Sequence, residues 1–276
     1  MIIVFDVGNT ETTLGLYDGH RLAGHWRITT DVPRTADEFG TLLRMLVVEA
    51  GVPDGKVSDA AIGSVVPRVN EALRTACERW LGVTRLSVVD AGSPLPIQLA
   101  VDEPRTVGAD RIINTLAASR LYGRDAIVVD LGTATTFDCI TASGVFLGGV
   151  IAPGVLTSAE TLFRRTSKLP ATELVVPAKV IGTRTEECIR AGVLYGQADA
   201  IDGIVARIKA EWPAGHAVPI VVATGGLAET FAALCRSFDR VEPYLTLEGL
   251  RMAHGLLAGA TSPRGAASAD ESSSAR

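Results

Sequence analysis

Apolar residues occur along this chain either in short continuous runs or at the spacing of one helix face. Continuous runs are typical of central strands that are buried on both faces. They lie at residues 2–5, 60–66, 86–89, 126–129 and 219–223. Alternating segments follow two of these runs, at 13–17 and 21–29 after the first and at 136–141 and 145–151 after the fourth. Asp18-Gly19, between two of the alternating segments, is typical of a hairpin turn.

Helical spacing of apolar residues predicts seven helices. They cover residues 35–49, 69–80, 108–121, 155–163, 185–211, 227–235 and 247–257. The first begins with Thr35-Ala36-Asp37-Glu38, a capping box in which the Thr and Glu side chains each accept from the other's backbone N–H. For the helix near Thr185, capping is the default role of that threonine.

The succession of one buried strand, a polar turn and two alternating strands occurs twice, first from residue 2 and again from residue 126. This repetition predicts two similar α/β domains, at residues 1–115 and 116–258. Residues 259–276 are rich in Ser, Ala, Gly and charge, so we predict a disordered tail there.

Bulk composition narrows the possible partners and locations. The 276-residue chain has a net charge of −5 with dispersed basic residues, which argues against a nucleic-acid partner. No apolar run approaches the ~20 residues of a membrane helix, and the N-terminus lacks the basic region of a signal peptide. The four cysteines are far apart in sequence, which favours reduced thiols in a cytoplasmic protein and no structural zinc.

Candidate chemistry lies at the ends of two apolar strands. Asp6-Val7-Gly8-Asn9-Thr10 follows the first, and Asp130-Leu131-Gly132-Thr133 follows its counterpart. Glycine lets backbone N–H groups approach an anion, hydroxyls donate to it, and aspartate can hold Mg²⁺ or its waters. One such turn is weak evidence, but two in matching strand contexts predict a nucleotide held between two domains.

Three further motifs have two readings each. Gly108-Ala109-Asp110-Arg111 begins a predicted helix, where Asp110 is either a first-turn acid that suits the helix dipole or a general base, with Arg111 gripping an anionic substrate. Gly148-Gly149 and Pro153-Gly154 are either a strand end and helix start or a close backbone approach to a ligand. Thr224-Gly225-Gly226 is either a tight turn or a platform for a ring or ribose.

Taken together, in this order and spacing, these motifs resemble those of type III pantothenate kinases, which belong to the superfamily of acetate and sugar kinases and actin. The likeness covers about residues 1–258. It implies an α/β fold of two similar actin-like (ribonuclease H-like) domains, each with a mixed five-stranded sheet flanked by helices, and a nucleotide cleft between them. It also implies ATP-dependent phosphorylation of pantothenate, the first committed step of coenzyme A synthesis, by a homodimer that uses Mg²⁺ and a monovalent cation, K⁺ or NH₄⁺.

The resemblance assigns roles to residues that match its motifs. The ATP-binding set is Asp6, Val7, Gly8, Asn9, Thr10, Glu11, Thr12, Thr13 and Thr133. The pantothenate-binding set is Gly108, Ala109, Asp110, Arg111 and Thr185, with Asp110 as the proton acceptor. Asp130 would hold the monovalent cation, and Asp6 would hold Mg²⁺ directly or through water. The chain departs from the family at Val101, where an aromatic residue is common.

Other readings compete with this one. A small sugar or acyl kinase of the same superfamily would have a similar fold. Some relatives of the family act as accessory factors in transcription, although such a binding protein has no evident need for Asp6, Asp110, Arg111 and Asp130 together. An actin-like structural ATPase would need interface insertions, for which this chain length leaves no room.

Overall fold

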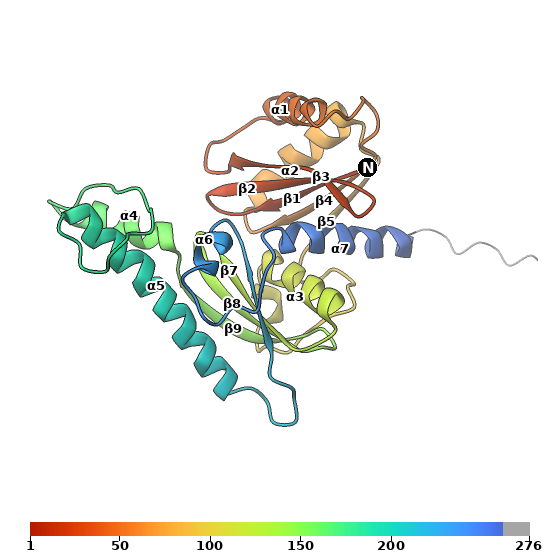
Figure 1. The fold of residues 1–276 in the computed structure, drawn as a ribbon. Coiled ribbons are helices and arrows are strands. Elements are labelled where there is room, and N and C mark those ends of the chain that lie inside the picture. The colour runs from red at the N-terminus through yellow and green to blue at the C-terminus, as the bar shows by residue number, and fades with distance from the viewer. Residues whose placement is uncertain (262–276) are drawn as a thin grey trace, which may run out of the picture.

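The computed structural model describes residues 1–261, which form two β-sheets with helices on their faces (Figure 1). The first sheet has five strands in the order β3-β2-β1-β4-β5. Their bounds are β1 (Ile2–Val7), β2 (Glu11–Asp18), β3 (Arg21–Thr29), β4 (Asp59–Ser64) and β5 (Arg85–Val89). Strand β1 pairs antiparallel with β2 and parallel with β4, so it is the central strand that its continuous apolar run predicts.

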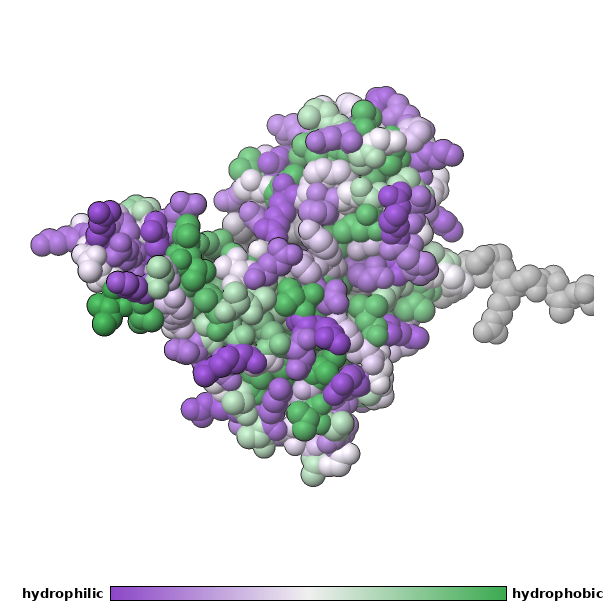
Figure 2. All heavy atoms as spheres, in the orientation of Figure 1, coloured by the Kyte–Doolittle hydropathy of each residue, from purple (hydrophilic) through white to green (hydrophobic). Residues whose placement is uncertain are grey.

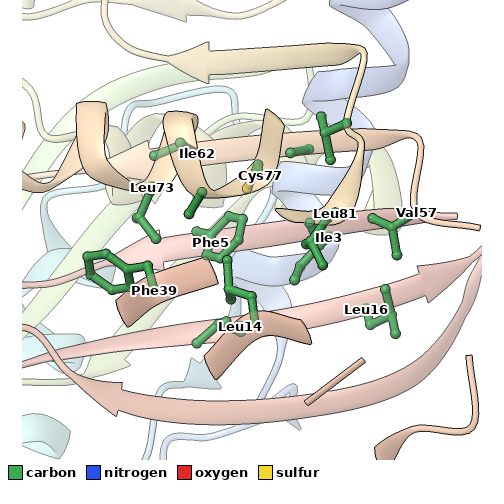
Figure 3. Close-up of a cluster of buried hydrophobic side chains, with 14 of the residues drawn as sticks. Ile3, Phe5, Leu14, Leu16, Phe39, Val57, Ile62, Leu73, Cys77 and Leu81 are labelled. Carbon is green, nitrogen blue, oxygen red and sulfur yellow. The ribbon is translucent and has the colours of Figure 1, made fainter. Parts of the chain in front are cut away.

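Alternation along β1 divides its side chains between two cores. Ile3, Phe5 and Val7 face α1 (Ala36–Glu49), α2 (Pro67–Ala76) and the π-helix η1 (Cys77–Leu81), where Figure 3 shows Phe5 among Leu14, Phe39 and Leu73. Val4 faces the opposite way, toward α3 (Ala109–Tyr122) and α7 (Leu245–Thr261). A strand with apolar residues on both faces is stable only when helices cover both.

The capping box predicted at Thr35 is confirmed. The backbone N–H of Thr35 donates to Glu38 Oε2 at 2.7 Å, and the backbone N–H of Glu38 donates to Thr35 Oγ1 at 3.3 Å.

The second sheet has six strands, in the order β11-β10-β7-β8-β9-β6, where we predicted five. Their bounds are β6 (Gln98–Leu99), β7 (Ala126–Leu131), β8 (Ala134–Ile140), β9 (Val145–Pro153), β10 (Ile220–Thr224) and β11 (Arg240–Val241). The extra strand is β6, which pairs parallel with β9 at the sheet edge. Two residues are too few to show an alternating pattern, and this explains the error.

Without β6, the second sheet repeats the first strand for strand. In each, a central strand pairs antiparallel with the next strand of a meander and parallel with a later strand that arrives after a helix. The turn after β1 and the turn after β7 are therefore equivalent positions.

The remaining helices are α4 (Val155–Arg165), α5 (Thr185–Ala210) and α6 (Ala228–Ala232), with a short 3-10 turn, η2 (Pro104–Thr106). Helix α7 returns to the first sheet and packs on β1, β4 and β5 while lying along α3. The predicted domain division at residue 115 falls inside α3 and stays a prediction. Of the predicted tail, residues 259–261 belong to α7 and residues 262–276 lie outside the described residues. No helix within residues 1–261 combines the length and apolar character needed to cross a membrane.

Candidate active site

The turn after β1 presents two exposed polar residues, Asn9 and Thr10. Gly8 makes the turn tight: its N–H donates to the Glu11 carbonyl oxygen at 3.0 Å, and a Cβ at Gly8 would lie only 2.9 Å from that oxygen. Asp6 precedes the turn and lies opposite Thr13 in the β1–β2 register. The turn thus places polar groups on a backbone that no bulkier residue could follow.

Three other members of the predicted ATP set differ in what they expose. The side chain of Val7 is in the core, so only its backbone can serve a ligand. Thr12 is buried and its hydroxyl lies 2.7 Å from that of Thr30. Glu11 is exposed, with its carboxylate 3.8 Å from the Arg27 guanidinium.

Asp130, which precedes the equivalent turn after β7, is contacted by residues from α3 and from the turn after β10. Asn114 of α3 donates to Asp130 Oδ2 at 3.4 Å, and Thr246 of α7 in turn donates to Asn114 Oδ1 at 2.9 Å. Gly225, in the left-handed region with φ of 89°, lies against Asp130 so closely that a Cβ would be 2.5 Å from Oδ1. The motif Thr224-Gly225-Gly226 therefore allows the β10 turn to pack directly on Asp130.

The two turns meet. Thr133 Oγ1 donates to Thr10 Oγ1 at 3.1 Å, which is a direct contact between the two halves of the molecule. The carbonyl oxygen of Thr133 accepts from Gly154 N at 3.2 Å and from Thr157 Oγ1 at 2.7 Å. The Pro153-Gly154 motif thus supports the second turn from behind, as the start of α4.

Helix α3 delivers its first turn to the same place. Gly108 is its N-cap residue, Ala109 is buried, and Asp110 Oδ1 accepts from the Arg111 N–H at 2.9 Å. The two readings of Asp110 are compatible, because its carboxylate bonds a first-turn N–H and also faces the strand-end carboxylates.

The pKa values of these carboxylates are raised by burial, and two of them by neighbouring negative charge. Burial raises the pKa of Asp6 well above its usual range, and the charges of Asp110 and Asp130 raise it further. Burial and the charge of Asp110 raise the pKa of Asp130 to about 6. Burial also raises the pKa of Asp110, which the N–H and charge of Arg111 partly oppose. Such mutual repulsion requires nearby cations for all three groups to be ionised.

These groups suit a cation that brings part of its own coordination shell. Among residues 1–261, no three His, Cys, Asp or Glu side chains lie close enough to form a complete protein metal site. Mg²⁺ usually takes one or two carboxylates and completes its shell with water and phosphate oxygens. Asp6 fits that requirement at the end of β1, and Asp130 offers a second carboxylate at the end of β7 for the predicted monovalent cation.

Thr185 is not part of this cluster. It is the exposed first residue of α5, at the end of that helix which projects together with part of α4 as an arm in Figure 1. Its predicted capping role is wrong, because Arg184 is the N-cap residue and no side chain caps the helix there. Glu187 Oε2 instead accepts from the N–H of Thr183 at 2.8 Å, upstream of the helix.

Sequence reasoning missed three residues that border the site. Asp138 of β8 is fully buried and pairs with Arg111 at 2.6 Å; burial raises its pKa to about 7 although Arg111 opposes the shift. A charged residue inside a buried strand was an available signal. Asn114 was a similar signal, as an amide among apolar helix residues. No sequence signal pointed to Arg27 of β3. In the structure its guanidinium lies against Gly226, which follows β10 of the second sheet, and a Cβ at Gly226 would lie 2.6 Å from Arg27 Nη1.

At Val101 the site wall remains apolar. Its side chain is partly buried against the cluster that contains Phe146, and a Cβ at Gly148 would lie 3.7 Å from Val101 Cγ1.

The two sheets, which repeat one strand order, define an actin-like α/β fold. A solved structure described as a Baf family transcriptional activator from Campylobacter jejuni has a similar fold. It has a TM-score of 0.57 and 18% identity, and the likeness covers 93% of this chain and 99% of that one.

Sequence comparison is more specific. The sequence model of the type III pantothenate kinase family matches residues 2–207. Type III pantothenate kinases from Acidothermus cellulolyticus and Roseiflexus castenholzii are 46% and 47% identical to this chain over 252 residues, covering 91% of it and 97% of each relative. The chain belongs to the type III pantothenate kinase family, as its motifs predicted.

Proposed function

We propose that this protein transfers the γ-phosphoryl group of ATP to the primary hydroxyl of pantothenate, giving 4′-phosphopantothenate for coenzyme A biosynthesis. Besides membership of the family, one structural observation supports the proposal. Asp6, Asp110 and Asp130 come from separate elements, the charges of Asp110 and Asp130 act on Asp6, and the two polar turns meet at Thr10 and Thr133. Phosphoryl transfer depends mainly on positioning and on neutralising charge, and this arrangement suits both.

For ATP, the first turn would supply backbone N–H groups together with Asn9 and Thr10. Thr133 would reach the phosphates from the second turn, and its contact with Thr10 supports this role. Asp6 would hold Mg²⁺, directly or through water, and the bound ion would neutralise phosphate charge. Thr12 and Val7 would act through the shape they give the turn, since their side chains are buried.

For pantothenate, Asp110 would accept the proton of the attacking hydroxyl. Its raised pKa favours this role, because a general base is most effective when its pKa approaches the working pH. Arg111 would pair with the pantothenate carboxylate through two parallel N–H donors. Gly108 and Ala109 would let the substrate approach the helix start.

Asp130 would hold the monovalent cation, K⁺ or NH₄⁺. The proposal is supported by the charge of the site, where the charges of Asp110 and Asp130 raise the pKa of Asp138 while Arg111 opposes the shift. ATP adds further negative charge, so a cation beside Asp130 would relieve repulsion without participating in bond formation.

We also propose a homodimer that works in the cytoplasm, where ATP is available. Hydrophobic spheres gather on the projecting arm in Figure 2. The exposed apolar residues of this segment are Leu156, Leu162, Phe163, Val175, Val176, Val180 and Ile181. An apolar surface of this kind is typical of protein–protein contacts. Thr185 lies on the same arm, and we propose that it contacts pantothenate only when the homodimer has formed.

Two other functions are compatible with the same fold. A sugar or acyl kinase would use the same phosphate turns with another acceptor. A non-catalytic transcription factor would share the fold, as the Campylobacter jejuni structure illustrates, but would not need a cluster of buried, mutually repelling carboxylates.

The test is a kinase assay with a panel of acceptors. Purified protein with ATP, Mg²⁺ and K⁺ is expected to phosphorylate pantothenate and to leave glycerol, acetate and N-acetylglucosamine unmodified. Activity on one of those acceptors in preference to pantothenate would favour the alternative kinase. Absence of ATP turnover with any acceptor would favour the non-catalytic reading.

A further inference from the structure

Asp138 is a buried carboxylate to which the proposed reaction gives no role. Its side chain is fully buried in β8, and Oδ1 accepts from Arg111 Nε at 2.6 Å. Its second oxygen, Oδ2, has no hydrogen-bond partner among the described residues. A half-satisfied carboxylate in a protein interior is costly, so its presence needs an explanation.

Arg111 is fixed by three contacts. Nε donates to Asp138, Nη2 donates to the carbonyl oxygen of Phe137 at 3.3 Å, and the guanidinium lies over the Phe146 ring at 5.0 Å from its centroid. The side chain still has 15% of its surface exposed. With Nε donating to Asp138 and one N–H of Nη2 donating to Phe137, Nη1 and the second N–H of Nη2 form the edge left to receive a ligand.

Gly149 makes this placement possible. A Cβ there would lie 2.5 Å from Arg111 Nη2 and would also collide with the Phe137 carbonyl oxygen. The second glycine of the Gly148-Gly149 motif thus clears the path along which Arg111 crosses β8 and β9.

Stability alone does not account for the pair. Replacing a buried ion pair with apolar residues of similar volume is often neutral or stabilising, so such a pair is weak evidence of a contribution to stability. Geometry is a better explanation, because Arg111 is adjacent to Asp110 in the first turn of α3. An arginine free to change rotamer would not present a fixed pair of donors beside the base.

We propose that Asp138 is a positioning residue for substrate recognition, which holds the guanidinium of Arg111 so that its Nη1–Nη2 edge faces the carboxylate of pantothenate. The inference rests on the proposed function. It adds an explanation of why the enzyme would prefer an acceptor that carries a carboxylate. Asp138 would touch neither substrate nor phosphate and would act only through Arg111.

The experiment compares two acceptors in steady-state assays of the full chain. Pantothenate carries the carboxylate, and panthenol has a neutral hydroxymethyl group in its place while retaining the reacting hydroxyl. For Asp138→Asn we expect KM for pantothenate to rise about 10-fold or more, in keeping with the loss of a charge-assisted hydrogen bond. We expect KM for panthenol and kcat for both acceptors to change less than about 3-fold.

A double variant keeps the test valid if Asp138→Asn alone does not fold. Asp138→Asn combined with Arg111→Gln leaves neither an unpaired aspartate nor an unpaired arginine, and it should match Arg111→Gln alone in kcat/KM for both acceptors. A further loss of about 10-fold in the double variant would overturn the inference, because Asp138 would then act independently of Arg111.

Other outcomes are also decisive. An equal rise in KM for both acceptors, or a fall in kcat with unchanged KM, would contradict the positioning role while leaving pantothenate kinase activity intact. A wild-type protein that phosphorylates neither acceptor would instead refute the proposed function, and the inference with it.

Discussion

At the scale of single residues, the central feature is repulsion among buried carboxylates. Each of Asp6, Asp110 and Asp130 has a raised pKa, and burial is the largest cause in every case. At neutral pH such groups destabilise the folded protein, because burial and neighbouring negative charge both disfavour the ionised form. They become useful when cations and an anionic ligand bind beside them, which is what a metal-nucleotide supplies.

The cation proposed at Asp130 leads to a first prediction at this scale. Exchanging K⁺ for Na⁺ at constant ionic strength should lower kcat/KM several-fold, because a site that selects one cation by size and coordination loses its occupant. Steady-state assays with saturating Mg²⁺ measure the effect. Asp130→Asn is the matched control, since it keeps the volume and removes the charge, and the variant should no longer respond to the exchange.

Equal wild-type activity in the two salts would count against a selective site at Asp130. A response of the same size in the Asp130→Asn variant would place the cation elsewhere.

At the scale of elements, strongly patterned segments could be predicted and weakly patterned ones could not. The helix predicted at 185–211 is α5 (Thr185–Ala210), and the one predicted at 35–49 is α1 (Ala36–Glu49). The two-residue strands β6 and β11 have no periodicity to detect. The predicted helix at 69–80 corresponds to α2 followed by the π-helix η1, because a change in hydrogen bonding leaves the apolar spacing almost unchanged.

The site was predictable where strand ends supply it. Asp6 and Asp130 lie near the ends of equivalent strands, as the repeated pattern predicted, and their role in the site stays a prediction. The pairing of Arg111 with Asp138 was not predictable, because it depends on how α3 packs against β8. The same holds for the chain of contacts from Thr246 through Asn114 to Asp130, which needs α7 to return to α3.

At the scale of the whole molecule, the carboxylate cluster should govern how stability depends on pH. The pKa values of Asp130 and Asp138 are about 6 and about 7 in the folded protein, against an ordinary value of 3.8. Both groups therefore bind protons more tightly when the protein is folded. Their contribution to stability is complete below about pH 4 and is lost as the pH rises through 6 to 7.

The free energy of unfolding, measured with urea without Mg²⁺ or nucleotide, should therefore increase by about 4 kcal/mol between pH 7.5 and pH 5. Carboxylates with lowered pKa values, such as Asp59 and Asp202, have the opposite effect but only near and below their ordinary pKa, outside this window. Asp138→Asn should flatten the dependence. A free energy of unfolding that falls steadily from pH 7.5 to pH 5 would contradict this electrostatic account.

The whole account depends on the start of α3 being the catalytic point between the two turns, and Asp110→Asn tests that most directly. The substitution removes a base without changing the side-chain volume, so the variant should fold with an unchanged circular dichroism spectrum. With ATP, Mg²⁺ and K⁺ present, its kcat for 4′-phosphopantothenate, identified by mass spectrometry, should be about 10²–10⁴-fold below that of the wild type. A kcat close to the wild-type value would contradict the assignment of Asp110 as the proton acceptor and the active site built around it.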